Sequence, residues 1–578
     1  MPKNNHANVF VKQAFRRFFI PSLLAQLGLA IGGIADCIFV GNAIGVVGLT
    51  AISISQPVYL LFNTISYSLS IGGSIRYAAA LSEGKEKEGN RIFGNVIRFA
   101  FFTYLLLCGL GLLFLPQLLR FLGAGAPGTQ VWECCRQVVR AQLLLIPLMF
   151  LQGPFYYFIN CDNRPKLAAV ALVTSSTLDV LFNYIFVVRM KIGIVGSVYA
   201  TGVGAAAMVL ISLTHFLFKK GCLRFTWPAF DFKEVFCSFK TGFATSIQHI
   251  FQFVTILFCN RMLMRLSGEL GVAVLDIVFN VTLLTASVYD ALSMALQPMI
   301  STFRGERNRQ NIRETLGEAV KVSVIMSVIL TAVLELFPGA IGQLFGLRGA
   351  AELASGKTAI RIYAIGILAS GFNMLMTYYY QALEQEKISY LLFTLRSFVL
   401  FLLYACLFGN HRLNFFWWTY PATEFTTLAF LIRYNRDHGS WTYLPGEEHD
   451  VFTCTIYREH ADLGQVEQQV NTYMEGMNAS TQQTYYVTMM VEEVCGVILD
   501  KASAEYIQLT LVPHEDGTVT LQLRDNAKRF NPFEVSTENI DLMDEIGLDA
   551  LGVKLVKKKA KEFFYRQYAG FNTLVVRI

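Results

Sequence analysis

The stretch SLLAQLGLAIGGIADCIFVGNAIG, residues 22–45, is an apolar run that contains a single charged residue, Asp36. About 20 apolar residues at 1.5 Å each cross the hydrocarbon core of a bilayer, so a run of this length predicts a transmembrane helix. Its glycines allow close packing against neighbouring helices. No Lys or Arg stands on the helix face of Asp36 to neutralise the carboxylate.

Similar apolar runs recur along most of the chain. Of its 578 residues, 54% are hydrophobic and 16% are charged, whereas a soluble domain carries about 25% charged residues. The sequence therefore predicts an all-α polytopic membrane protein in contact with the lipid bilayer. We expect about twelve transmembrane helices, centred near Leu29, Phe62, Leu106, Leu145, Val173, Ala205, Val254, Leu284, Ile329, Leu368, Leu400 and Leu428.

The distribution of positive charge predicts the orientation. Lys and Arg are concentrated before the first run and in the even-numbered loops, as in residues 85–91 and 304–313, and are sparse in the other loops. Because cytoplasmic loops carry the excess of positive charge, both termini are predicted to be cytoplasmic in the inner membrane of the cell. Orientation explains the net charge of +6 better than binding of nucleic acid does.

The two halves of the membrane region share an internal repeat. Residues 82–86 match 303–307, Lys166 matches Lys387, and Tyr199 matches Tyr420, each at an offset of 221 residues. Six helices per half is an even number, so the halves would run parallel about an axis along the membrane normal. We expect an N-lobe at 1–218, a C-lobe at 219–436 and a substrate cavity between them.

The composition changes after the last apolar run. Residues 437–448 form a polar linker with Gly and Pro, and 449–578 have the pattern of an α+β sandwich. Strands are predicted at 452–456, 506–511, 519–523 and 573–578, and helices at 463–477, 481–501 and 551–563.

Charged residues within the spans are the candidate sites, because a charge in a bilayer is costly and usually functional. They are Asp36, Asp179, Asp276, Asp290 and Glu424. Ser175 and Asn183 stand one turn either side of Asp179, so three oxygen-bearing side chains share a face that suits a hard monovalent cation or a proton relay. The alternative is that these carboxyl groups hold helices together by hydrogen bonds.

Several spaced motifs resemble the multidrug and toxic compound extrusion (MATE) family over roughly residues 15–435. They are Ile20-Pro21, residues 35–42 (ADCIFVGN), 70–73 (SIGG), 163–165 (NRP), 178–179 (LD), 193–196 (GIVG) and 297–301 (QPMIS).

The resemblance implies a secondary antiporter that exports small organic compounds, above all cations, in exchange for Na⁺ or H⁺. It assigns Asp36 and Asp179 to a cation site in the N-lobe. The family asparagine one turn before Asp179 is Ser175 here, which leaves the coupling ion open, and Asn183 could compensate. Asp276, Asp290 and Glu424 remain candidates for the second lobe.

The tail is similar to the histidine-kinase-like ATPase fold, in its anti-sigma-factor serine kinase branch. Residues 491–500 (VEEVCGVILD), 524–532 (RDNAKRFNP), 551–556 (LGVKLV) and 570–574 (GFNTL) carry this resemblance. It implies a nucleotide site at Glu493, Asp525, Asn526, Gly547 and Gly552, with Asp525 reading adenine and Glu493 near the catalytic base. The magnesium-binding asparagine of the family falls at Val497, and a glycine falls at Ala527. Without the metal ligand, phosphoryl transfer loses its main charge neutralisation, so we expect no phosphoryl transfer from ATP and Mg²⁺ and a catalytically inactive, regulatory tail.

Three functions stay open at this level. The first is ion-coupled export of a small molecule, with a tail that binds a cytoplasmic protein partner. The second is export of a lipid-linked or other specific metabolite, and the third is a membrane-tethered kinase or sensor of the anti-sigma type. No GxxxxGK[ST] loop occurs in the chain, which argues against an ATP-driven pump.

Overall fold

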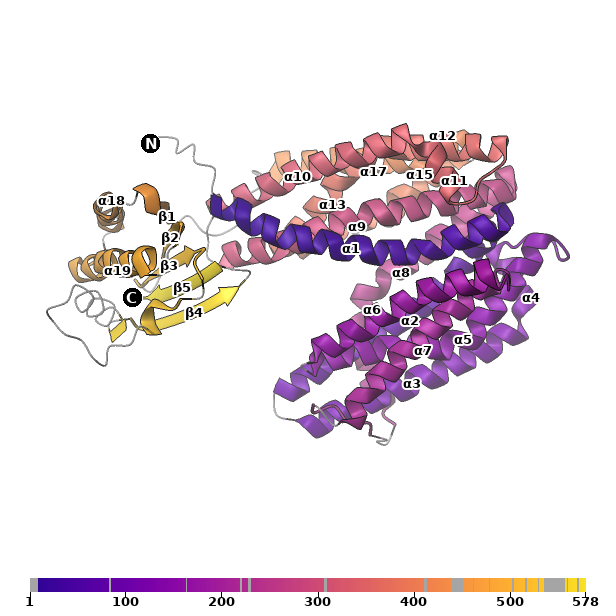
Figure 1. The fold of residues 1–578 in the computed structure, drawn as a ribbon, viewed down its shortest axis with the longest axis horizontal. Helices are drawn as coiled ribbons and strands as arrows, with labels where there is room; N and C mark the ends of the chain where they lie inside the picture. The colour runs from indigo at the N-terminus through magenta and orange to yellow at the C-terminus, as the bar shows by residue number, and fades with distance from the viewer. Residues whose placement is uncertain are drawn as a thin grey trace.

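Two bundles of long helices and a separate small α+β unit make up the molecule (Figure 1). The structure is a computed structural model. It describes residues 9–578 except 83–84, 163, 219–220, 227–229, 306–308, 410–412, 439–450, 461, 478, 502–503, 515–516, 529, 535–556, 559 and 569–570. The two bundles diverge toward the end at which the first helix begins and the α+β unit lies (Figure 1).

The helices of residues 9–217 include those of the first bundle, together with the first helix, which lies along the other bundle (Figure 1). They are α1 (Val9–Ile44), α2 (Val46–Ser82), α3 (Glu86–Leu113), α4 (Leu115–Leu122), α5 (Gln130–Cys161), α6 (Pro165–Asn183), the π-helical turn η1 (Tyr184–Arg189) and α7 (Val195–Leu217).

The second set of helices is interrupted more often. It comprises α8 (Phe232–Ser267), α9 (Glu269–Gly305), α10 (Arg309–Leu336), α11 (Pro338–Leu344), α12 (Ala350–Ile365), α13 (Ile367–Ala382), α14 (Glu386–Thr394), the π-helical turn η2 (Leu395–Val399), α15 (Leu400–Gly409), α16 (Leu413–Phe416) and α17 (Thr419–His438).

Fewer helices qualify as membrane spans than the sequence pattern predicts. Within the described residues, ten helices are long and apolar enough to cross a membrane, and the pair α12 and α13, bent by 49°, makes an eleventh. All twelve expected centres lie in helices, but the last, Leu428, lies in α17, which carries Glu424, Arg433, Arg436 and Asp437. These charges keep α17 below the apolarity of a span, so the prediction of about twelve exceeds the ten or eleven found.

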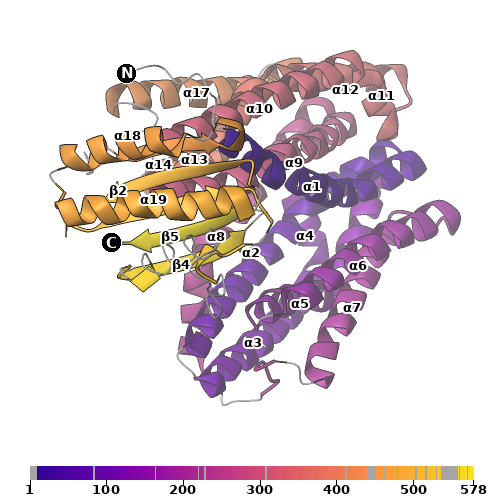
Figure 2. The ribbon, with the colours of Figure 1, turned by 60° about the vertical axis from the view of Figure 1, so that its left-hand side comes forward.

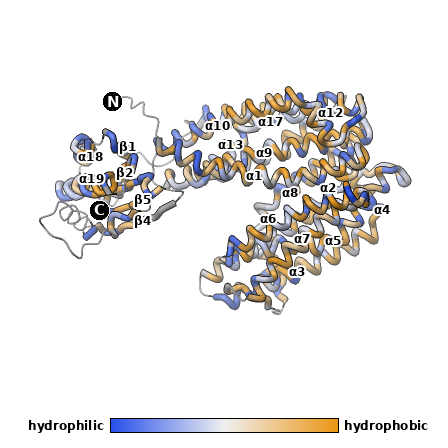
Figure 3. The backbone as a smooth tube through the Cα atoms, in the orientation of Figure 1, coloured by the Kyte–Doolittle hydropathy of each residue, from blue (hydrophilic) through white to orange (hydrophobic). Residues whose placement is uncertain are grey.

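Apolar side chains on the outer faces of the helices confirm a membrane environment. Ile325, Val328 and Ile329 of α10 are exposed at helical spacing, as are Phe102, Leu105 and Leu106 of α3. Figure 3 shows hydrophobic residues along both bundles and a mixed pattern in the α+β unit. Water would disfavour exposed apolar stripes of this length, whereas lipid tails cover them at no cost.

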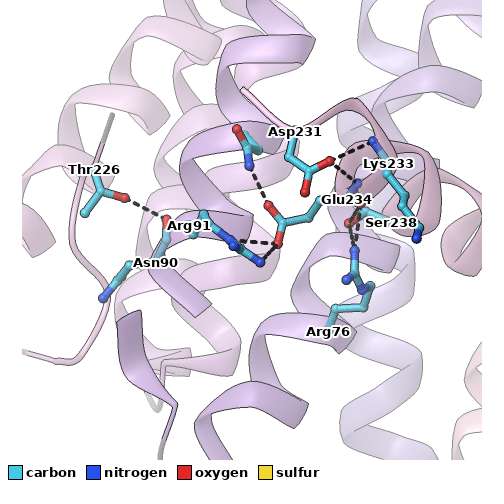
Figure 4. A network of polar contacts seen from close by, with 9 residues as sticks. Arg76, Asn90, Arg91, Thr226, Asp231, Lys233, Glu234 and Ser238 are labelled. Carbon is cyan, nitrogen blue, oxygen red and sulfur yellow. Dashed lines mark hydrogen bonds and ion pairs between the residues drawn. The ribbon is translucent and has the colours of Figure 1, made fainter. Parts of the chain in front are cut away.

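The start of α8 is tied to the first bundle by a buried acidic residue. Glu234 accepts hydrogen bonds from Arg91 at 3.1 Å and from Asn95 at 2.5 Å, both on α3. Arg76 of α2 donates to the Glu234 backbone oxygen at 2.7 Å and to Ser238 at 3.0 Å (Figure 4). Beyond this network α8 packs along α2, while α1 packs along α9.

The α+β unit is an antiparallel sheet with two helices on one face (Figure 2). Its five strands lie in the order β1 (Phe452–Tyr457), β2 (Tyr506–Pro513), β3 (Val519–Asp525), β5 (Phe571–Arg577) and β4 (Glu562–Tyr568). The long helices are α18 (Leu463–Gly476) and α19 (Thr481–Lys501), and η3 (Arg458–His460) and η4 (Pro532–Glu534) are single turns.

Most of the elements predicted for the tail are confirmed, with two differences. Residues 562–563, predicted as the end of a helix, begin strand β4, which pairs with β5 at the edge of the sheet. The rest of that predicted helix lies mostly outside the described residues. The predicted linker, 437–448, begins two residues inside α17 and otherwise also lies outside them.

Candidate functional site

Asp36 and Asp179 come together around one asparagine. Asp36 lies on α1, and Asp179 and Asn183 lie one turn apart at the end of α6. The side-chain amide of Asn183 donates a hydrogen bond to the Asp36 carboxylate and a longer one, 3.4 Å, to Asp179. The structure thus brings three of the four predicted coupling residues into direct contact across two helices.

The surroundings of this cluster are rich in oxygen. The side-chain oxygen of Asn183 is buried and has no hydrogen-bond partner in the described part of the chain. Thr201 of α7 lies near the Asp179 side chain, and its hydroxyl donates a hydrogen bond to the Ser197 backbone oxygen at 3.2 Å. Ser175 lies one turn before Asp179, against Gly204 of α7. A Cβ on Gly204 would stand 2.7 Å from the Ser175 backbone oxygen, so a glycine is needed for α7 to approach this closely.

In the described part of the chain, Asp36 and Asp179 are not neutralised by a basic side chain. Among the residues that the structure describes, neither Asp36 nor Asp179 forms an ion pair with Lys or Arg. Two carboxylates, an unpartnered amide oxygen and nearby hydroxyls are the donor set that a hard cation or a shared proton requires. The backbone supports the site, because α6 passes into the π-helical turn η1 directly after Asn183, and such turns are frequent at functional sites.

Glu424 has a different environment. Arg396, in the π-helical turn η2, forms an ion pair with Glu424 at 2.5 Å and donates a hydrogen bond to Ser370 at 2.8 Å. Asn373 donates to the other carboxylate oxygen of Glu424 at 2.9 Å. Glu424 is therefore a neutralised carboxylate whose oxygens both have partners, unlike the cluster at Asp36.

Asp276 lies beside the same ion pair, in the wall of a cavity. The cavity has a volume of about 250 Å³ and is lined by Asp276, Glu424 and Arg396 together with Gln252, Thr255 and Thr423. The hydroxyl groups of Thr255 and Thr423 are buried without partners among the described residues. Unpartnered polar groups inside a partly apolar cavity are suited to hold a ligand that hydrogen-bonds to them.

Asp290 does not join Asp276. Its carboxylate accepts a hydrogen bond from the Tyr378 hydroxyl at 2.9 Å, and Tyr378 lines a second cavity of about 370 Å³. Met374 and Arg396 line both cavities, so Arg396 lies where the two adjoin. Asp276 thus lines the first cavity, whereas Asp290 contacts the second cavity through Tyr378.

Helix α1 contacts both acidic regions through adjacent residues. Asp36 accepts from Asn183 of α6, whereas the next residue, Cys37, accepts a hydrogen bond from Asn280 of α9 at 3.2 Å. Asn280 also donates to the Asp276 backbone oxygen at 2.8 Å. A displacement of α1 would therefore change both groups at once.

In the tail, the predicted nucleotide residues are engaged in local contacts. The Asp525 carboxylate accepts from Asn572 at 2.8 Å and from the Ala527 backbone at 2.9 Å. Asn526 donates to Glu505 at 2.9 Å. Burial raises the pKa of Asp525, while the Asn572 and Ala527 hydrogen bonds act against this rise.

The remaining residues predicted for the nucleotide site lie on α19 or outside the described residues. Glu493 is half-buried on α19, and Val497, where the resemblance of the tail predicted a magnesium ligand to fall, is buried in the apolar core between α19 and the sheet. Gly547 and Gly552 lie outside the described residues.

Sequence reasoning missed Arg396, Thr201 and Gly204. Arg396 stood in an apolar run and could have been found by applying the rule for intramembrane charges to basic residues as well as acidic ones. Thr201 and Gly204 carry no charge, and their place beside Asp179 depends on how α7 packs on α6.

Comparisons with known proteins agree on the membrane half. The profile of the MatE family matches residues 21–185 and 243–407, which is more than half of the chain. The chain is 22% identical over 330 residues to "Probable multidrug resistance protein YoeA" of Bacillus subtilis (strain 168), covering 55% of this chain and 69% of that protein. It is 20% identical over 378 residues to "Multidrug export protein MepA" of Staphylococcus haemolyticus (strain JCSC1435), covering 65% and 82%.

Solved structures share the fold of the helical part. An inward-facing MATE family transporter of the MOP superfamily gives a TM-score of 0.65 at 18% identity, over 72% of this chain and 98% of its own. The outward-facing conformation of such a transporter gives 0.55 at 20% identity, over 74% and 96%. The MATE multidrug transporter DinF-BH gives 0.56 at 21% identity, over 74% and 95%. The chain belongs to the MatE family of membrane transporters.

Proposed function

We propose that the chain is a secondary antiporter that exports small organic compounds, above all organic cations, in exchange for Na⁺ or H⁺. The observation that carries this proposal is the cluster of Asp36, Asp179 and Asn183, in which two intramembrane carboxylates share an amide and have no basic partner among the described residues. The names of relatives such as YoeA and MepA, both tied to multidrug resistance or export, support the substrate class.

Each element of the cluster has a role in this mechanism. Asp36 and Asp179 bind the coupling cation or proton, Asn183 and Ser175 complete the oxygen set, and Thr201 orients Asp179. When the ion neutralises the carboxylates, their attraction for a cationic substrate falls, so ion and substrate compete for one charge. Such competition is what an exchange mechanism requires.

The cavity at Asp276 is the candidate substrate site in the second lobe. Glu424 and Arg396 cancel each other's charge, so Asp276 leaves one formal negative charge in the wall of the cavity. That balance favours a monovalent organic cation, with Thr255 and Thr423 as hydrogen-bond partners.

In this proposal the membrane half has two six-helix repeats, both termini are cytoplasmic, and the tail regulates export without phosphoryl transfer. Lipid-linked substrates and a kinase function have no comparable support.

The test is transport by the full chain reconstituted in lipid vesicles. Efflux of ethidium is followed under a Na⁺ gradient alone, a pH gradient alone, and neither. We expect one of the two gradients to drive export and Asp36→Asn to abolish it while membrane insertion stays normal, because the substitution removes the ion-binding charge. Glu133→Gln, on the exposed surface of α5, is the control. Equal export by Asp36→Asn and the unmodified chain would overturn the assignment.

A further inference from the structure

The sheet of the tail has two faces with different side chains. On one face, Leu509, Leu521, Leu523 and Leu574 form an apolar core with α18 and α19. Alternate residues point to the other face. There the strand register places Gln508 of β2, Arg524 of β3 and Thr573 of β5 side by side.

The polar residues of this second face are buried. Gln508 is 1% exposed and Arg524 is 4% exposed. Burying an amide or a guanidinium is unfavourable unless partners satisfy it. The second face must therefore be covered by a surface that offers such partners, and the ends of α1, α9 and α10 cover it (Figure 1).

Two hydrogen-bonded pairs join the sheet to these helices. Gln508 and Asn311 of α10 exchange hydrogen bonds through their side-chain amides, at 3.0 Å and 3.3 Å. The Tyr506 hydroxyl donates to Gln13 of α1 at 3.1 Å. The reciprocal amide pair is buried on both sides, so neither amide would find water in exchange if its partner were removed.

Aromatic residues complete the contact. The Arg524 guanidinium lies 5.6 Å from the ring centre of Phe10 on α1 and 5.3 Å from that of Phe303 on α9. Phe571 of β5 packs edge-on against Phe10 at 5.0 Å, and Arg17 of α1 lies over the Phe571 ring at 4.6 Å. Desolvated cation–π pairs of this kind are among the stronger contacts that Arg makes.

The contact fixes one particular part of α1. Phe10, Val11, Ala14, Phe15 and Phe19 are buried in the cluster that includes Tyr506 and Phe571. Beyond them, side chains of the same helix such as Leu24 and Ile31 are exposed. The tail thus adds packing to the first three turns of the helix that carries Asp36.

We propose that the second face of the tail sheet is an interaction surface for the carrier's own α1, α9 and α10, and that its docking restrains α1 and slows the transport cycle. Asp36 lies 22 residues after Ala14 on one continuous helix, about 33 Å along its axis at 1.5 Å per residue. Movement of the start of α1 relative to α9 requires the sheet to release Phe10 and Gln13. The effect on rate rests on the proposed ion coupling at Asp36, whereas the docking itself does not.

The surface is separate from the predicted nucleotide residues. Asp525 follows Arg524 and points to the opposite face, where it meets Asn572. A molecule bound on the helix side of the sheet would therefore leave the docking surface in place. A protein partner that binds the second face itself would have to displace the carrier and would release α1.

The experiment uses the full chain in lipid vesicles with three variants: Arg524→Ala, Asn311→Ala with Gln508→Ala, and Tyr485→Ala as a control on the exposed side of α19. Hydrogen–deuterium exchange measures docking, and ion-driven ethidium export measures the cycle. We expect faster exchange in residues 9–19 and about fivefold faster export for the first two variants, and neither change for the control.

A double-mutant cycle separates docking from general damage. If the amide pair acts as one contact, Asn311→Ala and Gln508→Ala each accelerate export and together do no more than either alone. Unchanged exchange in residues 9–19 for all variants would overturn the docking. Faster exchange with unchanged or slower export would overturn the restraint. If the unmodified chain shows no ion-driven export, the proposed function fails while the exchange measurement still decides the docking.

Discussion

The helices α6 and α14 each lead into a π-helical turn inside the membrane half, yet the two sites beside these turns differ in charge. At η1 the structure joins Asp36, Asp179 and Asn183 with no basic partner among the described residues. At η2 it joins Glu424 to Arg396 at 2.5 Å. A carboxylate paired with a guanidinium is already neutralised, whereas one without a basic partner can be neutralised by a bound cation or a proton. Under the proposed function, ion exchange belongs to the first site, and the ion pair at η2 supports the fold.

The largest effect is expected from breaking the ion pair at η2. Arg396→Ala leaves the Glu424 carboxylate buried without its cation, which typically destabilises a protein by about 3 to 5 kcal/mol. We expect a much lower yield of folded protein in membranes and a lower melting temperature in detergent. Arg396→Ala combined with Glu424→Gln should recover most of the loss, because the unpaired charge is gone.

A more exposed ion pair provides the control for that prediction. Glu335→Gln removes the partner of Arg361 in a more exposed pair at 3.6 Å, and should change stability by less than about 1 kcal/mol. A single Arg396→Ala chain as stable as the unmodified one would show that Glu424 is not structurally dependent on Arg396, and the contrast between the two π-helical turns would be lost.

The second effect concerns the site at η1. Asp179→Asn should leave folding and membrane insertion intact, because it removes a charge that the bilayer disfavours. Ion-driven export should fall by about 100-fold, near the upper end for coupling between two ligands. Vesicle transport under the driving gradient measures the loss, and melting in detergent provides the control. A stability loss like that of Arg396→Ala, or unchanged export, would contradict the difference between the sites.

The sequence predicted the elements better than the contacts between them. Apolar runs predicted each described helix that could cross a membrane, because a bilayer demands long apolar segments, but the predicted number, about twelve, exceeds the ten or eleven found. The spacing of Asp179 and Asn183 predicted their shared face. The approach of Asp36 to Asn183 depends on how α1 packs between α6 and α9, which spacing within one helix does not specify. The pairing of Arg396 with Glu424 and the strand at 562–568 were missed for the same reason, since partner residues far along the chain determine both.

A smaller effect is expected from the close approach of α7 to the η1 site. In Gly204→Ala, the new Cβ would lie 2.7 Å from the Ser175 backbone oxygen, so α7 must move away from α6. Overpacking of this kind costs about 1 to 3 kcal/mol. We expect a several-fold weaker dependence of export on the coupling ion, because Thr201 moves with α7.

The matched control is Gly109→Ala on α3, where a Cβ would meet nothing within 4 Å. This variant should be neutral or slightly stabilising, because Ala is the better helix former. If both glycine variants left the ion concentration for half-maximal export unchanged, the oxygen set at η1 would not include the α7 side.

The smallest effect concerns Asp525, a buried carboxylate in the tail that forms no ion pair with Lys or Arg in the part of the chain that the structure describes. Burial raises its pKa, and the hydrogen bonds from Asn572 and the Ala527 backbone only partly oppose the rise. A carboxyl group with a raised pKa in the folded state stabilises the fold fully below its unfolded pKa of about 3.9. That contribution is lost as the pH rises through the folded value.

Asp525→Asn keeps an oxygen to accept both hydrogen bonds but does not titrate. The measurement is hydrogen exchange in β3 and β5 of the full chain, corrected for its intrinsic pH dependence. In the unmodified protein we therefore expect less protection at neutral than at acidic pH. In the variant we expect protection to change less with pH. Asp500→Asn, which removes an exposed charge from α19, controls for net charge. The same pH dependence of protection in Asp525→Asn and in the unmodified chain would mean that hydrogen bonds alone can offset burial of a carboxylate. The lack of a basic partner for Asp36 among the described residues would then no longer distinguish that site from a structural one.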